Sequence, residues 1–324
     1  MRVTVTGATG FIGTQLIERL TEDGHHVTAV VRQPSAIPSL RIKGVAAIVG
    51  DVCDAESLSP AMTGADVVFH LARARAHGTR PREAFAVNVG GSRNVATAAT
   101  KAGVGRIVHA SSVAVYGSRV GIVNEESVIH PDSAYARSKA DAESVMHSIC
   151  GDRVVIARIT SVMGKAARTW RPLTKSAMTG TLRLVGDGSN KHHPADVSDV
   201  VDALLLCGLR DGVGGRTYNV AGPDSLTFTR LRELLALTAN GGKPVKHPRS
   251  YPRGPMNLYY QLGVVSDRLF GLRPPLFESV MFITANRVLD LTRAREELGF
   301  QPSVDVSTAV TRTVDWFRRE NLLP

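Results

Sequence analysis

A glycine-rich turn near the start of the chain constrains the fold more than any other feature. Residues 6–13 read Thr-Gly-Ala-Thr-Gly-Phe-Ile-Gly and follow directly on a β-branched run at residues 3–6. Gly7 permits a tight turn, Gly10 lets the backbone approach a pyrophosphate, and Gly13 allows the next helix to pack on the strand. The amides and dipole of that helix then hold the phosphates. We therefore predict a dinucleotide-binding turn.

Strand and helix patterns alternate through the first half of the chain. Strands are expected at residues 3–6, 27–32, 45–49, 66–70, 106–109 and 153–158, and helices at residues 11–21, 55–62, 82–101 and 133–148. This alternation predicts parallel β-α-β units, and the apolar run at 27–31 suits a sheet covered on both faces. The expected fold is α/β, with a Rossmann-type doubly wound parallel sheet.

The rhythm changes after Gly164. Residues 165–190 are basic and have few strand signals, and later helical patterns occur at residues 197–206, 228–238, 293–298 and 306–320, with a short strand at 218–220. We expect a dinucleotide-binding domain over residues 1–164, to which residues 196–222 return. Residues 165–195 and 223–324 are expected to form a smaller, interleaved substrate-binding region.

The end of the second strand bears on the choice of cofactor. A site that prefers NAD usually carries Asp or Glu near this point, on the ribose hydroxyls. This chain has Arg32 instead, and a guanidinium suits a 2′-phosphate. The pattern favours NADPH, with NAD as the alternative if Arg32 is only a surface residue.

Asp51 and Val52 follow the third strand, where the adenine edge of a dinucleotide would lie. Asp51 can accept a hydrogen bond from the adenine amino group. A helix N-cap at Asp51 or Asp54 explains these residues equally well.

A tyrosine and a lysine stand four residues apart, at Tyr135 and Lys139. This spacing places both on one face of a helix. An ammonium and an oxidised nicotinamide both favour the phenolate of such a tyrosine, which makes it a proton donor or acceptor for a carbonyl or alcohol. Ser112, after the fifth strand, can hydrogen-bond the substrate oxygen.

With these residues in place, the chain resembles an extended short-chain dehydrogenase/reductase, the group of sugar-nucleotide epimerases and dehydratases, dihydroflavonol reductases and 3β-hydroxysteroid dehydrogenases. The resemblance covers nearly the whole chain and includes residues 6–13, 50–52, 69–72, 88–91, 110–117, 135–139, 185–188, 218–222 and 297–302.

The resemblance implies catalytic roles for Ser112, Tyr135 and Lys139, with Ser112 rather than Ser111 as the active serine. Asn88 is expected to bridge backbone groups near the site. The expected cofactor-binding residues are Gly7, Thr9, Gly10, Phe11, Ile12, Gly13, Arg32, Asp51, Val52, Leu71, Ala72, Tyr135 and Lys139.

The chain departs from the sugar-nucleotide enzymes at three places. Ser161 and Lys165 stand where those enzymes usually carry Asn and Pro, and residues 190–194, Asn-Lys-His-His-Pro, replace the region of a diphosphate-binding arginine. These departures favour a ketone reductase or alcohol dehydrogenase acting on a small organic or lipid-like substrate. A sugar-nucleotide epimerase or dehydratase is the second hypothesis, and a non-catalytic dinucleotide sensor the third.

Basic residues beyond the fourth strand suggest a site for an anionic part of the substrate. Arg73 and Arg75 would contact it together with Ser112 and Tyr135, and three further basic residues are expected to face the same cleft, namely Lys165, Arg168 and Arg171. The alternative is a solvated loop.

Composition limits the other function classes. The net charge of +10 is scattered, with no run of five basic residues, so we expect no nucleic-acid partner. The three cysteines lack metal-ligand spacing and the paired histidines have no third ligand nearby, so no metal is expected. We expect the histidines at the surface or in the substrate pocket. Residues 256–283 are apolar enough to lie on a membrane surface, although a substrate-domain helix explains them too, and no stable membrane insertion is expected. We expect a cytoplasmic enzyme, with a homodimer as a possibility.

Overall fold

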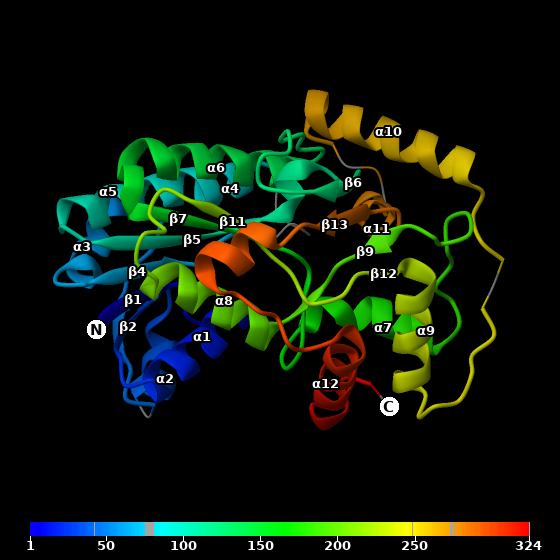
Figure 1. The fold of residues 1–324 in the computed structure, drawn as a ribbon, viewed down its shortest axis with the longest axis horizontal. Coiled ribbons are helices and arrows are strands. Elements are labelled where there is room, and N and C mark those ends of the chain that lie inside the picture. The colour runs from blue at the N-terminus through cyan, green and yellow to red at the C-terminus, as the bar shows by residue number, and fades with distance from the viewer. Residues whose placement is uncertain (42, 75–80, 248, 273, 275, 324) are drawn as a thin grey trace.

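A parallel sheet of seven strands forms the centre of the computed structural model, which describes residues 1–41, 43–74, 81–247, 249–272, 274 and 276–323. The strand order is β11-β7-β5-β4-β1-β2-β3, and each neighbouring pair is parallel (Figure 1). The bounds are Arg2–Thr6 for β1, His26–Val31 for β2, Ala46–Val49 for β3, Val67–His70 for β4, Arg106–Ser112 for β5, Val154–Ile159 for β7 and Thr217–Val220 for β11.

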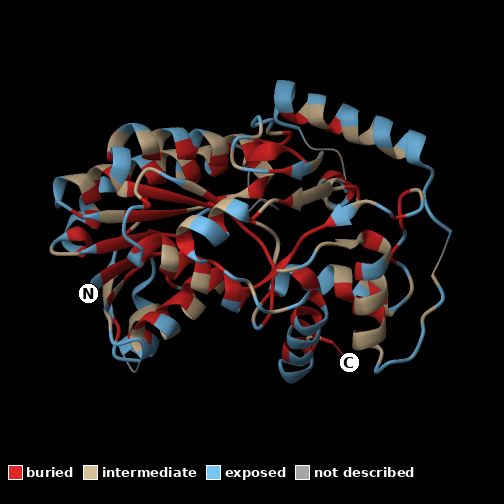
Figure 2. Cartoon of the chain, in the orientation of Figure 1, coloured by how far each residue is buried: buried red, intermediate tan, exposed pale blue. Residues whose placement is uncertain are grey.

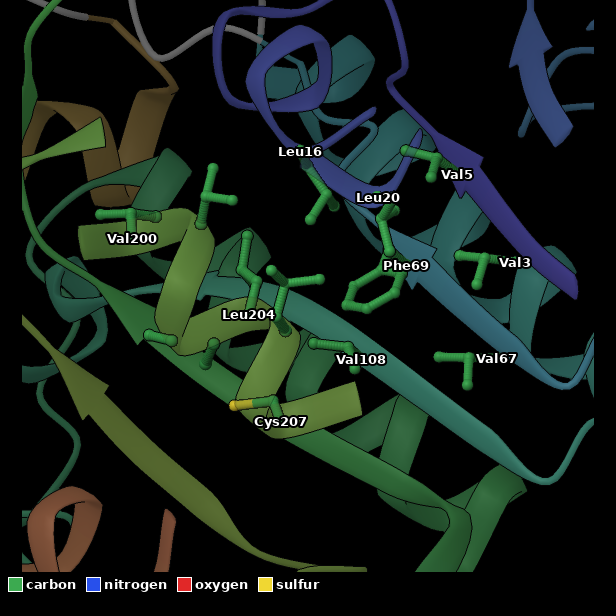
Figure 3. Close-up of a cluster of buried hydrophobic side chains, with 14 of the residues drawn as sticks. Val3, Val5, Leu16, Leu20, Val67, Phe69, Val108, Val200, Leu204 and Cys207 are labelled. Atoms are coloured by element: carbon green, nitrogen blue, oxygen red, sulfur yellow. The ribbon is translucent and has the colours of Figure 1, made fainter. Parts of the chain in front are cut away.

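Helices cover both faces of this sheet, because its strands are apolar on both sides. One face carries α1 (Phe11–Glu22), α2 (Ile37–Arg41) and α8 (Val197–Leu209), and buried side chains of α1 and α8 gather near Phe69 (Figure 3). The other face carries α3 (Ala55–Met62), α5 (Gly91–Lys101) and α6 (Ala134–Cys150). The predicted doubly wound Rossmann-type fold is confirmed.

The remaining elements gather beyond the carboxyl ends of the strands (Figure 1). Helices α7 (Arg171–Met178), α9 (Phe228–Ala239) and α12 (Val306–Arg319) enclose a second apolar core. Short strand pairs lie beside it, formed by β8 (Val162–Met163) with β10 (Ala195–Asp196), β9 (Lys191–His192) with β12 (Leu226–Thr227), and β6 (Arg119–Val123) with β13 (Asn286–Leu289). Two helices, α10 (Arg253–Phe270) and α11 (Phe277–Ile283), complete this part.

The structure differs from the sequence expectation around residues 82–101. Instead of one regular helix, α4 (Pro81–Phe85) runs into a π-helical turn at Ala86–Gly90 and then into α5. The buried Asn88 lies in that turn, where its side chain accepts from the Ala74 amide at 2.8 Å and donates to the Ser138 hydroxyl at 2.8 Å. A π-turn of this kind often marks a functional site. Asn88 thus bridges one backbone group, as expected, and one side chain.

Candidate active site

The glycine-rich turn has the close approach that its sequence predicts. Gly7 has φ of +71°, and a Cβ there would lie 2.6 Å from the Ala72 amide nitrogen. A Cβ on Gly13 would lie 2.2 Å from the Gly7 carbonyl oxygen. Gly10 is exposed at the N-terminus of α1, whose cap makes no side-chain hydrogen bond. Bare amides at a helix N-terminus fit the pyrophosphate of a dinucleotide.

The other expected cofactor residues surround this turn. Thr9 is exposed, while Phe11 and Ile12 are half-buried in the first turn of α1. Leu71 and Ala72 are also half-buried, and the Leu71 amide donates to the Thr6 carbonyl at 3.1 Å. The carboxyl ends of β1 and β4 therefore lie side by side, at the point where the strand order reverses. In open α/β sheets this switch point is where ligands bind.

Arg32, Asp51 and Cys53 gather at the ends of β2 and β3. Burial is the main reason that the pKa of Cys53 is raised; Asp51 adds to the shift and the charge of Arg32 opposes it. Arg32 is exposed and can reach a ligand. Asp51 Oδ1 accepts from the Cys53 amide at 2.8 Å, whereas Asp54 is the N-cap of α3. The N-cap alternative is thus correct for Asp54 and wrong for Asp51. Val52 is buried beside Gly91.

The two neighbouring serines of β5 have different surroundings. Ser111 is buried and donates to Glu143, which forms an ion pair with Arg158 at 2.8 Å. Ser112 is half-buried at the end of the strand, and its hydroxyl accepts from the Ala114 amide at 3.2 Å. A hydroxyl that accepts one bond still has its proton to donate. Of the two serines, Ser112 is therefore the one whose hydroxyl proton remains available at the end of the strand.

Lys139 is fully buried and reaches back to β5 from helix α6. Its Nζ donates to the Ala110 carbonyl at 2.7 Å and lies 3.4 Å from His109 Nε2. Burial, and to a lesser extent the charge of Arg73, lowers the pKa of Lys139 to about 7, while Glu143 opposes the shift. This contact ties the helix that carries Tyr135 to the strand that carries Ser112.

A row of buried polar side chains crosses the sheet beneath Lys139, and the sequence patterns did not reveal it. Thr6, His70 and His109 occupy matching positions on β1, β4 and β5. His70 hydrogen-bonds Thr6 at 2.7 Å, and its ring centroid lies 5.3 Å from that of His109. Burial lowers the pKa of both histidines, that of His70 to about 3. Neutral imidazoles therefore underlie the lysine.

Tyr135 is half-buried in the first turn of α6, one turn before Lys139. Ser133 caps the helix, accepting from the Ala136 amide at 3.2 Å. Asp267 of α10 accepts from the Ala134 amide at 2.6 Å and from Arg137 at 2.9 Å. The start of the helix that carries Tyr135 is thus fastened from two sides.

The expected basic cleft is only partly assembled. Arg73 is exposed, and its charge lies near enough to Lys139 to lower the pKa of that lysine. Arg75 lies outside the described residues. Arg168 and Arg171 do not face Arg73: Arg168 lies over the Trp316 ring of α12 at 5.4 Å, and Arg171 donates to the Leu322 carbonyl. Those two expectations are wrong, because the C-terminal segment offers these arginines closer partners.

The paired histidines are buried, so a surface location is wrong for both. His193 contacts the Gly222 carbonyl at 2.8 Å and accepts from the Leu289 amide at 3.1 Å. The His192 ring packs between Phe228 and Phe282. The pKa of His192 is lowered to about 3, chiefly by burial and also by Arg287. Within the described ranges no group of three or more potential metal ligands occurs.

The buried lysine should affect stability in a pH-dependent way. Above about pH 7 the folded protein loses the Lys139 proton, whereas the unfolded chain keeps it up to about pH 10, so the free energy of unfolding should rise with pH over this range. Lys139→Met removes this contribution. In the absence of cofactor, we expect the variant to be more stable by on the order of 2–4 kcal/mol at neutral pH. The gain should shrink toward pH 10 in denaturant titrations; a constant difference would contradict the buried, deprotonated lysine.

Comparison with known proteins agrees with this geometry. Residues 3–221 match the NAD dependent epimerase/dehydratase family. The chain belongs to this family and is a nicotinamide-dependent oxidoreductase of the extended short-chain dehydrogenase/reductase type.

Three relatives illustrate the range of the family. Sterol demethylase protein B of Methylococcus capsulatus is 30% identical, with 100% of both chains covered. The 2-alkyl-3-oxoalkanoate reductase of Stenotrophomonas maltophilia is 31% identical and covers 96% of this chain and 98% of its own. The solved structure of MoeE5 in complex with UDP-glucose and NAD is 25% identical, covers 99% of this chain and 100% of its own, and has a TM-score of 0.75.

Proposed function

We propose that this protein is an NADPH-dependent reductase that converts a ketone of a small organic or lipid-like substrate into an alcohol. The observation that carries the proposal is the contact of Lys139 with the Ala110 carbonyl, which holds Tyr135 and Ser112 at one end of the sheet. Residues 1–164 and 196–222 would bind the cofactor, and residues 165–195 and 223–324 the substrate.

The chain's own residues supply the acid and the orienting groups. When bound, the reduced nicotinamide supplies a hydride to the carbonyl carbon. The Ser112 hydroxyl donates a hydrogen bond to the carbonyl oxygen, and the Tyr135 phenol gives that oxygen its proton, so the product is a neutral alcohol. Lys139 favours the phenolate that remains on Tyr135 when the lysine is protonated.

The surroundings of residues 190–194 support a substrate without a diphosphate. Neither His192 nor His193 presents a positive charge at neutral pH, since burial lowers the pKa of each ring. His192 packs instead against the apolar rings of Phe228 and Phe282. Two full-length relatives are named for sterol and alkyl-ketone chemistry, which supports the lipid-like class.

A sugar-nucleotide epimerase is the second candidate, and its support is the likeness to MoeE5 in complex with UDP-glucose and NAD. A screen of ketones, β-keto acids and UDP-sugars, each with NADPH and with NADH, separates the two functions. Turnover of a ketone with NADPH supports the reductase, and turnover of UDP-sugars alone supports the epimerase. A homodimer and a cytoplasmic location stay predictions from the sequence.

Arg32 should set the cofactor preference. Losing its charge-assisted contact with a 2′-phosphate should cost on the order of 1.5–3 kcal/mol. Arg32→Ala is therefore expected to weaken NADPH binding by roughly tenfold or more and NADH binding only slightly. Dissociation constants from fluorescence titration test this, with the exposed Arg41→Ala as a matched control. Equal weakening of both cofactors would show that Arg32 makes no contact with the phosphate.

Arg73 is proposed to contact an anionic part of the substrate, because it is exposed near Lys139. Arg73→Ala should raise KM for an acidic ketone severalfold and leave KM for an uncharged ketone unchanged. The double replacement of Arg73 and Arg75 should enlarge this difference. Unchanged KM values for both substrates would mean that these arginines lie in a solvated loop and do not contact the substrate.

A further inference from the structure

Helix α10 carries an apolar stripe that no part of the described chain covers. Leu258, Leu262, Val265 and Leu269 follow one another at helical spacing and are 58%, 59%, 51% and 67% exposed. Phe270 ends the helix and Leu272 follows it, at 70% and 65% exposure. We call the four stripe residues the outer face of α10. Figure 2 shows the helix exposed along most of its length.

This concentration of apolar surface is unusual for the molecule. Of the fourteen large apolar side chains that are exposed among the described residues, eight lie between Tyr251 and Leu276. Single exposed apolar residues are ordinary on a protein surface, but a contiguous stripe marks an interaction site.

The opposite side of the same helix is fastened to the active site. Tyr260 donates to Asp132 at 2.5 Å, and Gly263 packs against the ring of Phe277. Asp267 accepts from the Ala134 amide at 2.6 Å, next to Tyr135. Residues 260, 263 and 267 thus face the start of the catalytic helix, and the outer face points away from it. The helix therefore already packs on the rest of the chain through its other side, and the stripe is not part of the core.

The charges around α10 identify the partner. From residue 234 to residue 277 the sequence has a single acidic residue, Asp267, which is buried and paired with Arg137. The described basic residues of the same stretch are all exposed, namely Lys243, Lys246, Arg249, Arg253 and Arg268. An apolar stripe on a helix with basic residues at both ends is typical of segments that lie in the plane of an anionic membrane surface.

We propose that the outer face of α10 docks on an anionic lipid bilayer, with the helix lying in the interface. A second copy of this chain fits less well, because two such basic segments would repel each other across a symmetric interface. No helix among the described residues is long and apolar enough to cross a membrane. Docking therefore means reversible surface binding.

Docking would bring the active site close to the lipid. A helix with its side chains is about 10 Å across, and α10 separates the outer face from the first turn of α6. An apolar substrate dissolved in the bilayer would then reach the site after a short path. Docking of α10 on the bilayer does not depend on which carbonyl compound the enzyme reduces.

The test measures binding of the whole protein to vesicles by flotation. We expect binding to vesicles of phosphatidylcholine with phosphatidylserine, little binding to phosphatidylcholine alone, and weaker binding as salt is raised. The double variant Leu262→Ser/Leu269→Ser should bind the anionic vesicles at least about tenfold more weakly. Arg249→Glu/Arg268→Glu should also lose binding. Thermal melts establish that each variant is folded.

Matched controls come from exposed residues far from α10. Two double variants make the same kinds of replacement, apolar to serine and basic to glutamate, and should keep wild-type binding to the vesicles. They are Val49→Ser/Leu209→Ser and Lys101→Glu/Arg210→Glu. The proposal is overturned if the wild-type protein does not bind anionic vesicles, or if the control variants lose as much binding as the α10 variants. It is also overturned if the protein is a dimer that binds no vesicles and that Leu262→Ser/Leu269→Ser converts to a monomer, since a second copy would then cover the face.

Discussion

Replacing Tyr135 with phenylalanine is expected to lower turnover by at least about a hundredfold, which is the usual contribution of a positioned general acid. The variant keeps the ring and loses only the hydroxyl that we propose as the proton donor to the substrate oxygen. The fold and the affinity for the cofactor should therefore change little. Steady-state kinetics and a cofactor titration on the same preparation measure both effects.

A second tyrosine provides the control for this experiment. Tyr218 is buried in β11, and its hydroxyl donates to Glu297 at 2.7 Å. Tyr218→Phe also removes one buried hydroxyl, but outside the proposed site, and should keep turnover within a few fold of wild type. A near-normal rate in the Tyr135→Phe variant would show that Tyr135 is not the general acid.

The second large effect concerns the buried ion pair behind the site. Arg158 binds Glu143 through two nitrogens, and it also donates to the Tyr116 hydroxyl at 2.9 Å. Both partners of the pair are nearly inaccessible, with side chains 7% and 6% exposed. Arg158→Met would leave the Glu143 carboxylate buried without its cation. We expect a loss of about 3–5 kcal/mol in the free energy of unfolding, measured by urea denaturation.

Two further variants show whether this loss comes from the unpaired charge. Arg19→Met breaks exposed pairs with Asp23 and Asp202 and should cost less than about 1 kcal/mol. The double variant Arg158→Met/Glu143→Leu removes both charges and should recover much of the stability that Arg158→Met loses. If the double variant is no more stable than the single one, the network of hydrogen bonds matters more than the unpaired carboxylate.

Local patterns in the sequence were sufficient for the cofactor half of the fold. The expected helix at residues 55–62 matches α3 residue for residue, and the glycine-rich turn lies at the switch point of the sheet. These features depend on neighbours a few residues apart, such as Gly7 with Gly13. The choice of Ser112 over Ser111 came from the residues that follow it, and the buried bond of Ser111 to Glu143 provides a structural reason for the same choice.

Contacts between distant segments were not accessible from those patterns. β6 and β13 pair across more than 160 residues, and these short runs of five and four residues do not reveal their partner. The row from Thr6 through His70 to His109 depends on the register of three strands. Arg168 and Arg171 were misplaced because their partners belong to the C-terminal segment. In each case the energy comes from tertiary packing, which local propensity does not report.

The fate of the cofactor tests the reductase proposal most directly. A reductase must release its cofactor after every turnover, whereas an epimerase retains the oxidised form and shows no net redox change. We predict that the purified protein carries little bound nicotinamide and consumes one NADPH for each ketone reduced, followed by absorbance of the reduced nicotinamide and by product analysis. Tightly bound NAD, together with interconversion of UDP-sugars at constant nicotinamide absorbance, would contradict the reductase and establish the epimerase in its place.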